Sequence, residues 1–112
     1  MYCIEIKKDQ IPYKAKIPIG DNIFYLYFKY NLYDNRVYCD LLDVNENILN
    51  EDEPVVLGQM MFARYYIDAA GNFNNKYPKA FLIPNFLDSA NTKNITFDNI
   101  DKARIYIQEV DV

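Results

Sequence analysis

Hydrophobic and polar residues alternate along much of this chain with a period of two, the spacing of a β-strand that buries one face. The alternation is clearest in the stretch "FYLYFKYN", residues 24–31. We assign one side of this stretch to the core: Phe24, Leu26, Phe28 and Tyr30. Tyr25 and Tyr27 then lie on the opposite face, where a second apolar surface needs something to cover it.

A tight turn and a second strand follow this stretch. Asp34 and Asn35 are residue types that tolerate the positive φ of hairpin turns, and the strand "RVYCDLLDV" begins directly after them. We therefore predict a β-hairpin over residues 23–43. In its second strand the alternation assigns Val37, Cys39 and Leu41 to the core, and Tyr38 and Asp40 to the outer face.

Further short strands are predicted on both sides of the hairpin. They cover residues 2–7, 14–19, 55–57, 79–86 and 103–112. The segment around residues 59–70 is ambiguous. A short helix would place Phe62, Tyr65, Tyr66 and Ala69 on one face, and a strand would pair Met61, Ala63, Tyr65 and Ile67.

These elements predict an all-β fold, a small antiparallel barrel or sandwich of about seven short strands. The chain has 112 residues, which suits one hydrophobic core, and contains neither a sequence repeat nor a linker. We expect a single β-domain over residues 1–112. The 11 Tyr and 7 Phe agree with this class, because aromatic side chains fit a pleated, half-buried surface.

Charge and hydropathy exclude several partners. The net charge of −4 argues against specific nucleic-acid binding, which needs clustered positive charge. No apolar run approaches the roughly 20 residues that span a bilayer, and none resembles a signal peptide. We expect no membrane contact and synthesis in the cytoplasm. The two cysteines, Cys3 and Cys39, are interpreted as buried free thiols.

One segment begins like a calcium loop. Asp43, Asn45 and Asn47 have the right spacing, but Ile48 stands where the sharp turn needs Gly, and Pro54 where a bidentate Glu is needed. We interpret the segment as an Asp/Asn turn, and the acidic run at residues 51–53 as a solvated loop. No metal site is predicted.

The search for catalytic residues finds none. The chain has no His, and Asp40 and Asp43 lie three positions apart, on opposite faces of a strand. No nucleophile motif, phosphate-binding loop or dinucleotide fingerprint is present. We predict no catalytic residue, no cofactor and no enzymatic activity.

The stretch "IPIGDNIFYLYFKYNLYDNRVYCDLLDVNENIL" resembles the cyanophage-type baseplate plug proteins of phage tails. In that family an aromatic strand ending in Tyr-Asn, here Tyr30-Asn31, leads through a hairpin into a strand ending D-[LI]-x-D, here residues 40–43. The later segments "EDEPVVLG" and "ITFDNIDKARIYIQEV" are also similar, the second through Asp98, Ile100, Asp101 and Arg104. The family tends to have Gly and Trp where this chain has Asn35 and Val37.

The resemblance implies a structural component of a phage or phage-tail-like contractile particle. Its place would be the baseplate of the virion or particle, as a plug on the tail axis at the hub, between tube and spike. The implied partners are hub, tube or spike proteins and further copies of the chain in a cyclic homo-oligomer. Synthesis in the host cytoplasm agrees with the absence of a signal-like segment. The acidic net charge agrees with a channel lumen along which DNA can slide without binding.

Tyr25, Tyr27 and Tyr38 are the residues that we expect at a protein interface. Alternatively, a second layer of the same domain covers them. A different function is a small β-domain binding module that recognises a receptor or carbohydrate, because exposed tyrosines also stack on sugars. Tyrosines in a groove at a loop end would favour that function. An enzyme built on an acidic pair from two strands is a third alternative.

Overall fold

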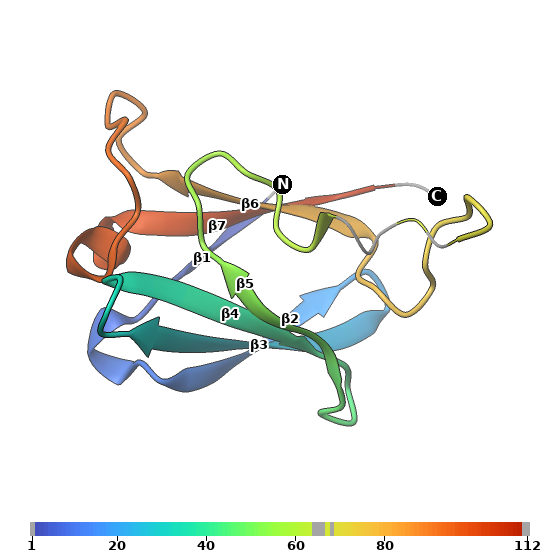
Figure 1. Ribbon diagram of the computed structural model, residues 1–112. Helices are drawn as coiled ribbons and strands as arrows, with labels where there is room; N and C mark the ends of the chain where they lie inside the picture. The colour runs from blue at the N-terminus through green and yellow to red at the C-terminus, as the bar shows by residue number, and fades with distance from the viewer. Residues whose placement is uncertain (1, 64–66, 68, 111–112) are drawn as a thin grey trace.

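Two antiparallel sheets face each other in the computed structural model, which describes residues 2–63, 67 and 69–110 (Figure 1). One sheet has four strands in the order β2-β3-β4-β5, and the other has three in the order β1-β7-β6. The strands of the described chain are β1 (Tyr2–Glu5), β2 (Tyr13–Ile19), β3 (Asn22–Asn31), β4 (Arg36–Leu42), β5 (Ile48–Pro54), β6 (Ala80–Phe86) and β7 (Ala103–Glu109).

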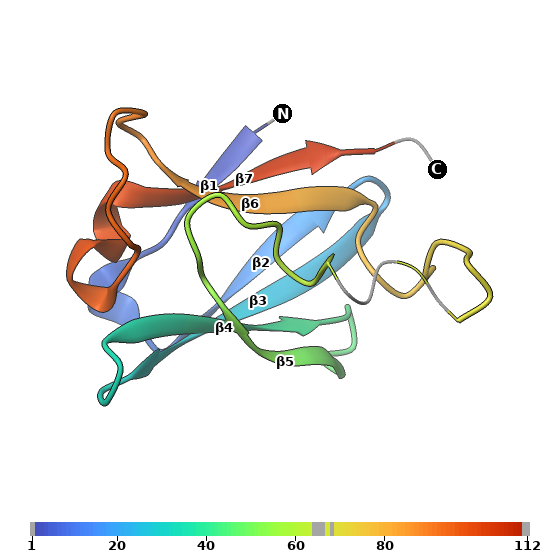
Figure 2. The same cartoon turned by 45° about the horizontal axis from the view of Figure 1, so that its top comes forward.

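The prediction of an all-β fold with about seven strands is confirmed, and the two sheets form a sandwich that does not close into a barrel. Figure 2 shows the two sheets from a second direction, with the long loops at the ends and on one side. Two 3₁₀ turns that lie wholly within the described residues connect strands, η1 (Lys8–Gln10) and η3 (Phe97–Lys102).

The predicted hairpin is formed by β3 and β4, whose register pairs Tyr25 with Leu42 and Asn31 with Arg36. Its inner face supplies one half of the core, as the alternation predicts: Phe24, Leu26, Phe28, Val37, Cys39 and Leu41 are buried. The other half comes from Leu82 in β6 and from Ile105 and Ile107 in β7. The two sheets therefore share one hydrophobic core.

Every described strand that contains a proline lies at a sheet edge. Pro18 is in β2, Pro54 ends β5 and Pro84 is in β6. Proline has no N–H to donate to a neighbouring strand, so an edge is the position that tolerates it. The edge of β6 is covered by the segment 58–61, whose Gly58 and Met61 amides donate to the carbonyls of Pro84 and Leu82, at 2.8 Å each.

The fifth strand differs from the prediction. Residues 55–57 were expected to form a strand and residues 51–53 a solvated loop, but β5 covers Ile48–Pro54 and contains the acidic run. The reason is that two of the acids have specific partners. Asp52 pairs with Lys29 of β3, and the Glu53 carboxylate accepts the amide of Phe62 at 3.0 Å.

The ambiguous segment at residues 59–70 forms neither an α-helix nor a strand where it is described, and Ala63 has 3₁₀ conformation. Phe62 is fully buried and has a φ of 61°, which a helix or strand does not allow. Ile67 forms a single bridge with Phe73. Tyr65 and Tyr66, which were named for both alternatives, lie outside the described residues.

The two cysteines differ in environment. Cys39 is fully buried in the core, and burial raises the pKa of its thiol well above the ordinary value. Cys3 is exposed, so its predicted burial is wrong. The physical reason is its position in β1 opposite Tyr106, on the outer face of the three-stranded sheet.

Candidate interaction surface

The outer face of the four-stranded sheet carries the three tyrosines predicted for an interface. Tyr25 and Tyr27 come from β3 and Tyr38 from β4, and all three are half-buried. The register places them on the same side, because Tyr38 lies opposite Lys29 and Tyr27 opposite Asp40. The other sheet packs on the opposite side (Figures 1 and 2). We call this set of three residues the tyrosine face.

Long charged side chains provide part of the cover over the tyrosine face. The Lys14 ammonium lies 5.4 Å from the centroid of the Tyr25 ring and also pairs with Glu46, in the turn between β4 and β5. Such a contact between a cation and a ring is favourable and easily rearranged at an exposed site. Tyr25 is thus shielded by one lysine rather than by a second layer of backbone.

A charged cluster lies beside Tyr27 and Tyr38. The Lys29 ammonium contacts the Asp40 carboxylate at 3.0 Å and also binds Asp52, whose amide donates to Asp40 at 2.8 Å. Burial by itself lowers the pKa of Lys29, but hydrogen bonds to Asp52 and Asp40 outweigh it and raise the pKa. Asp40 was predicted to face out. It does lie on the outer face, but this cluster buries it to 5% exposure.

The turn of the β3–β4 hairpin is held in place by its own side chains. The Asn31 side chain accepts the Tyr33 amide at 2.9 Å, and Asp34 accepts the Arg36 amide at 3.0 Å. Asp34 also accepts a hydrogen bond from the Tyr38 hydroxyl, which raises the pKa of that phenol. Asn35 has a φ of 56°, the left-handed conformation expected for this turn position.

Residues of the 3₁₀ turn η3 contact the same hairpin beside its turn. The Asn35 carbonyl accepts the Phe97 amide at 2.9 Å, and the Asn35 side chain donates to Asp98 at 2.9 Å. The Tyr30 ring stacks on Phe97 with their centroids 4.0 Å apart. These contacts join the hairpin to a segment more than sixty residues later, so the turn is rigidly placed.

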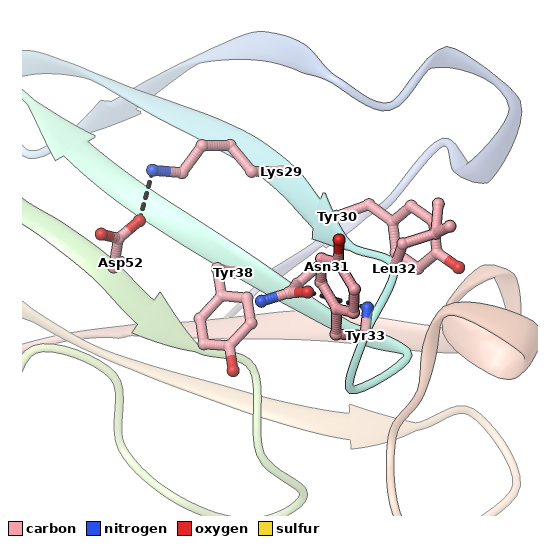
Figure 3. A pocket seen from close by; sticks show the side chains of 7 residues that line it. All are labelled: Lys29, Tyr30, Asn31, Leu32, Tyr33, Tyr38 and Asp52. Atoms are coloured by element: carbon pink, nitrogen blue, oxygen red, sulfur yellow. Dashed lines mark hydrogen bonds and ion pairs between the residues drawn. The ribbon is translucent and has the colours of Figure 1, made fainter.

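An open hollow of about 600 Å³ lies at this end of the sheet (Figure 3). Figure 3 shows Asn31, Tyr33 and Tyr38 gathered at the hairpin end, with the Lys29–Asp52 pair farther along the strands. The remaining lining residues are Tyr30 and Leu32. Of the three predicted interface residues, Tyr38 therefore borders this hollow, whereas Tyr25 and Tyr27 lie along the strand.

Sequence reasoning missed Leu32 and Tyr33. Their side chains are 76% and 101% exposed, the highest values among the large hydrophobic residues that the structure describes. A signal was available, because two apolar residues inside a predicted tight turn cannot point into the core of the sheet that the turn connects. Two adjacent large apolar side chains held in water at a rigid turn make the turn a candidate interaction site.

The Asp/Asn turn at residues 43–47 is confirmed. One Asp43 carboxylate oxygen accepts the amides of Asn45 and Asn47, each at 2.9 Å. The bond from the Asn47 amide is the main reason that the pKa of Asp43 lies below its ordinary value. Within residues 2–63, 67 and 69–110, no three His, Cys, Asp or Glu side chains are close enough together to hold a metal ion.

Comparisons with known proteins agree with the resemblance found in the sequence. The described chain contains no helix that could cross a membrane. No curated protein and no solved structure matches the chain. A family model does match, the one described as "Cyanophage baseplate Pam3 plug gp18", and the match extends over residues 1–109. The chain therefore belongs to the cyanophage baseplate plug family, whose members are structural proteins of the phage baseplate.

Proposed function

We propose that this chain plugs the tail axis of a phage or phage-tail-like contractile particle, at the baseplate hub between tube and spike. It acts by packing against neighbouring subunits, without catalysis. Its partners are hub, tube or spike proteins and further copies of the chain in a cyclic homo-oligomer. Family membership supports the baseplate location, and the uncovered tyrosine face is the observation that carries the mode of action.

The tyrosine face suits contact with a different subunit. Tyrosines bury a large area on binding and lose little conformational freedom, so they are common in the centres of interfaces. The surrounding ion pairs, Lys14 with Glu46 and Lys29 with Asp52, are at least partly exposed and would form the polar rim of such a contact. No second layer needs to be displaced for a neighbour to reach these residues.

Replacing the tyrosines separates this role from a purely structural one. Tyr25→Ala and Tyr27→Ala should block assembly of the baseplate, because the neighbouring subunit loses its anchors, while the isolated domain keeps its fold. Particles are counted by electron microscopy, and folding is followed by thermal unfolding of the purified variants. Val44→Ser, which removes an exposed apolar side chain from the turn after β4, is the matched control.

The location is tested by imaging assembled particles. A density of this fold on the axis, between tube and spike, is the expected result. A position at the periphery of the baseplate, or normal assembly of the Tyr25→Ala/Tyr27→Ala variant, would contradict the proposal. The proposal also includes synthesis of the chain in the host cytoplasm. Chain that has not yet assembled should therefore be recovered from the host cytoplasm.

Recognition of a receptor or carbohydrate is the second candidate. The observation in its favour is the hollow at the hairpin end, where the rings of Tyr30, Tyr33 and Tyr38 lie close to the amide of Asn31. The chain has no Trp, so its fluorescence comes from its 11 tyrosines, and the part of the quenching that Tyr33→Ala removes reports on this site. Saturable quenching by neutral oligosaccharides, lost in Tyr33→Ala, would support this candidate, and a flat titration would reject it.

A further inference from the structure

The hairpin tip, Leu32 and Tyr33, is an apolar projection at one end of the molecule. It lies in the turn between β3 and β4, and both side chains stand in solvent. The turn is fixed by hydrogen bonds that the Asn31 and Asp34 side chains accept and the Asn35 side chain donates, so the tip is already ordered before it meets a partner. An ordered projection binds with less loss of entropy than a flexible one.

A second hollow, of about 560 Å³, lies on the outer side of the three-stranded sheet. Its apolar lining consists of Leu57, Ile83, Phe86, Leu87 and Tyr106. Leu87 is 59% exposed, although it is surrounded by apolar side chains that could pack against it. We call this site the apolar hollow.

The rim of the apolar hollow is polar and complements the surroundings of the hairpin tip. Asn85 and Asp88 lie on the rim, where an amide and a carboxylate can bind the hydroxyl of an incoming tyrosine. Arg36 follows the tip, and its guanidinium makes no hydrogen bond or ion pair with any residue that the structure describes. Asp88 uses only one carboxylate oxygen within its loop, for the Ala90 amide at 3.0 Å. Arg36 of one molecule can therefore form an ion pair with Asp88 of a second molecule.

We propose that the hairpin tip of one copy of this chain docks into the apolar hollow of a second copy. The two surfaces share no residue and belong to different sheets, so each copy can use both at once. Both lie toward the same end of the molecule, where Figures 1 and 2 show the β3–β4 turn and the loop after β6.

A contact between two different surfaces of the same chain is heterologous, and its repetition gives a ring when the rotation between neighbours closes. The inference deepens the proposed function, because it names the surface through which copies would form the cyclic oligomer. It leaves Tyr25 and Tyr27 free for subunits of another kind. The contact itself belongs to the isolated chain and can be measured without the particle.

The first test is the size of the purified chain in solution, measured by light scattering over a range of concentrations. The wild-type chain should form an assembly larger than one chain. Tyr33→Ser in the tip and Leu87→Asp in the hollow should each weaken self-association about thirtyfold, the effect of losing one central anchor. Val44→Ser, at an exposed position outside both surfaces, should leave the assembly unchanged. Unchanged thermal unfolding of each variant excludes a folding defect.

Mixing the two variants gives the sharper test. A Tyr33→Ser chain keeps its hollow and a Leu87→Asp chain keeps its tip, so an equimolar mixture should form complexes of two chains and nothing larger. A wild-type chain that stays single at every concentration would overturn the inference, and so would a mixture that contains only single chains. If baseplate assembly is still blocked in the Tyr25→Ala/Tyr27→Ala variant, either failure would remove the contact between copies but leave the proposed plug role, which rests on contact with other subunits, standing.

Discussion

The phenol of Tyr38 donates a hydrogen bond to the carboxylate of Asp34, and this bond ties the second strand of the hairpin to the turn before it. The same carboxylate accepts the Arg36 amide. A single side chain in the turn therefore fixes both the backbone that follows it and one ring of the tyrosine face.

Tyr38→Phe should lower the free energy of unfolding by on the order of 0.5 kcal/mol, the low end for a hydrogen bond because the site is open to water. The hydrogen bond to Asp34 raises the pKa of Tyr38. The contribution of this bond to the free energy of unfolding is therefore fully present below the ordinary tyrosine pKa, and it is lost as the pH rises through the raised pKa of the folded protein. Urea unfolding should therefore give the same difference at neutral and at mildly alkaline pH. Tyr27→Phe is the control, since its hydroxyl makes no hydrogen bond within the described chain, and equal losses in both variants would contradict the assignment.

Lys29→Met should cost about 2 kcal/mol, because it leaves the buried Asp40 carboxylate without its cation. The full cost of breaking a buried pair is reduced here, since the Lys29 side chain is 30% exposed. Lys14→Met removes the exposed pair with Glu46 and should cost less than about 0.5 kcal/mol.

Chemical denaturation of both lysine variants measures the contrast. The double variant Lys29→Met/Asp40→Leu should recover much of the loss, since neither charge is then left unpaired. A Lys14→Met variant as unstable as Lys29→Met would show that the burial of Asp40 is not the cause.

Asn35→Ala should destabilise the hairpin by about 1 to 2 kcal/mol, because alanine is strained at a φ of 56° and loses the bond to Asp98. Asn35→Gly relieves the strain and loses only the side-chain bond, so it should fall between wild type and Asn35→Ala. Thermal unfolding ranks the three proteins, and an alanine variant more stable than the glycine variant would rule out strain as the dominant effect.

The two thiols should react at different stages. Cys3 is exposed and should react with a thiol reagent in the folded protein, whereas the buried Cys39, whose pKa is raised by burial, should react only after unfolding. A count of one thiol in the native state and two in denaturant is expected. Cys3→Ser should abolish the native reaction, and a persistent native thiol in that variant would place Cys39 at the surface.

Alternation and turn chemistry together predicted the parts of this fold that depend on local sequence. The hairpin, its turn residue Asn35 and its core side, with Phe28 and Leu41, follow from a period of two and from turn chemistry. Strand β5 could not be predicted in this way. Its acids are accommodated by Lys29, 23 residues before Asp52, and by the Phe62 amide, nine residues after Glu53, and the strand pattern indicates neither partner.

The candidate site was predictable to a similar extent. The outer position of Tyr25, Tyr27 and Tyr38 follows from the strand pattern, and their role at an interface remains a prediction. The burial of Asp40 was missed, because it depends on the Asp52 amide arriving from β5. The exposure of Cys3 was missed as well, because its burial was inferred from the general tendency of free cysteines to be buried, although alternation places Cys3 on the same side of its strand as Glu5.

The pairing of β1 with β7 has a consequence for the synthesis of the protein. Tyr2 lies opposite Ile107, so β1 can join its sheet only after β7, about a hundred residues later, has been synthesised. The β3–β4 hairpin joins neighbouring residues and can fold while the chain is still on the ribosome. The three-stranded sheet, which carries the apolar hollow, can form only after β7 has left the ribosome and paired with β1 and β6. The self-association proposed for that hollow therefore depends on β7 having folded.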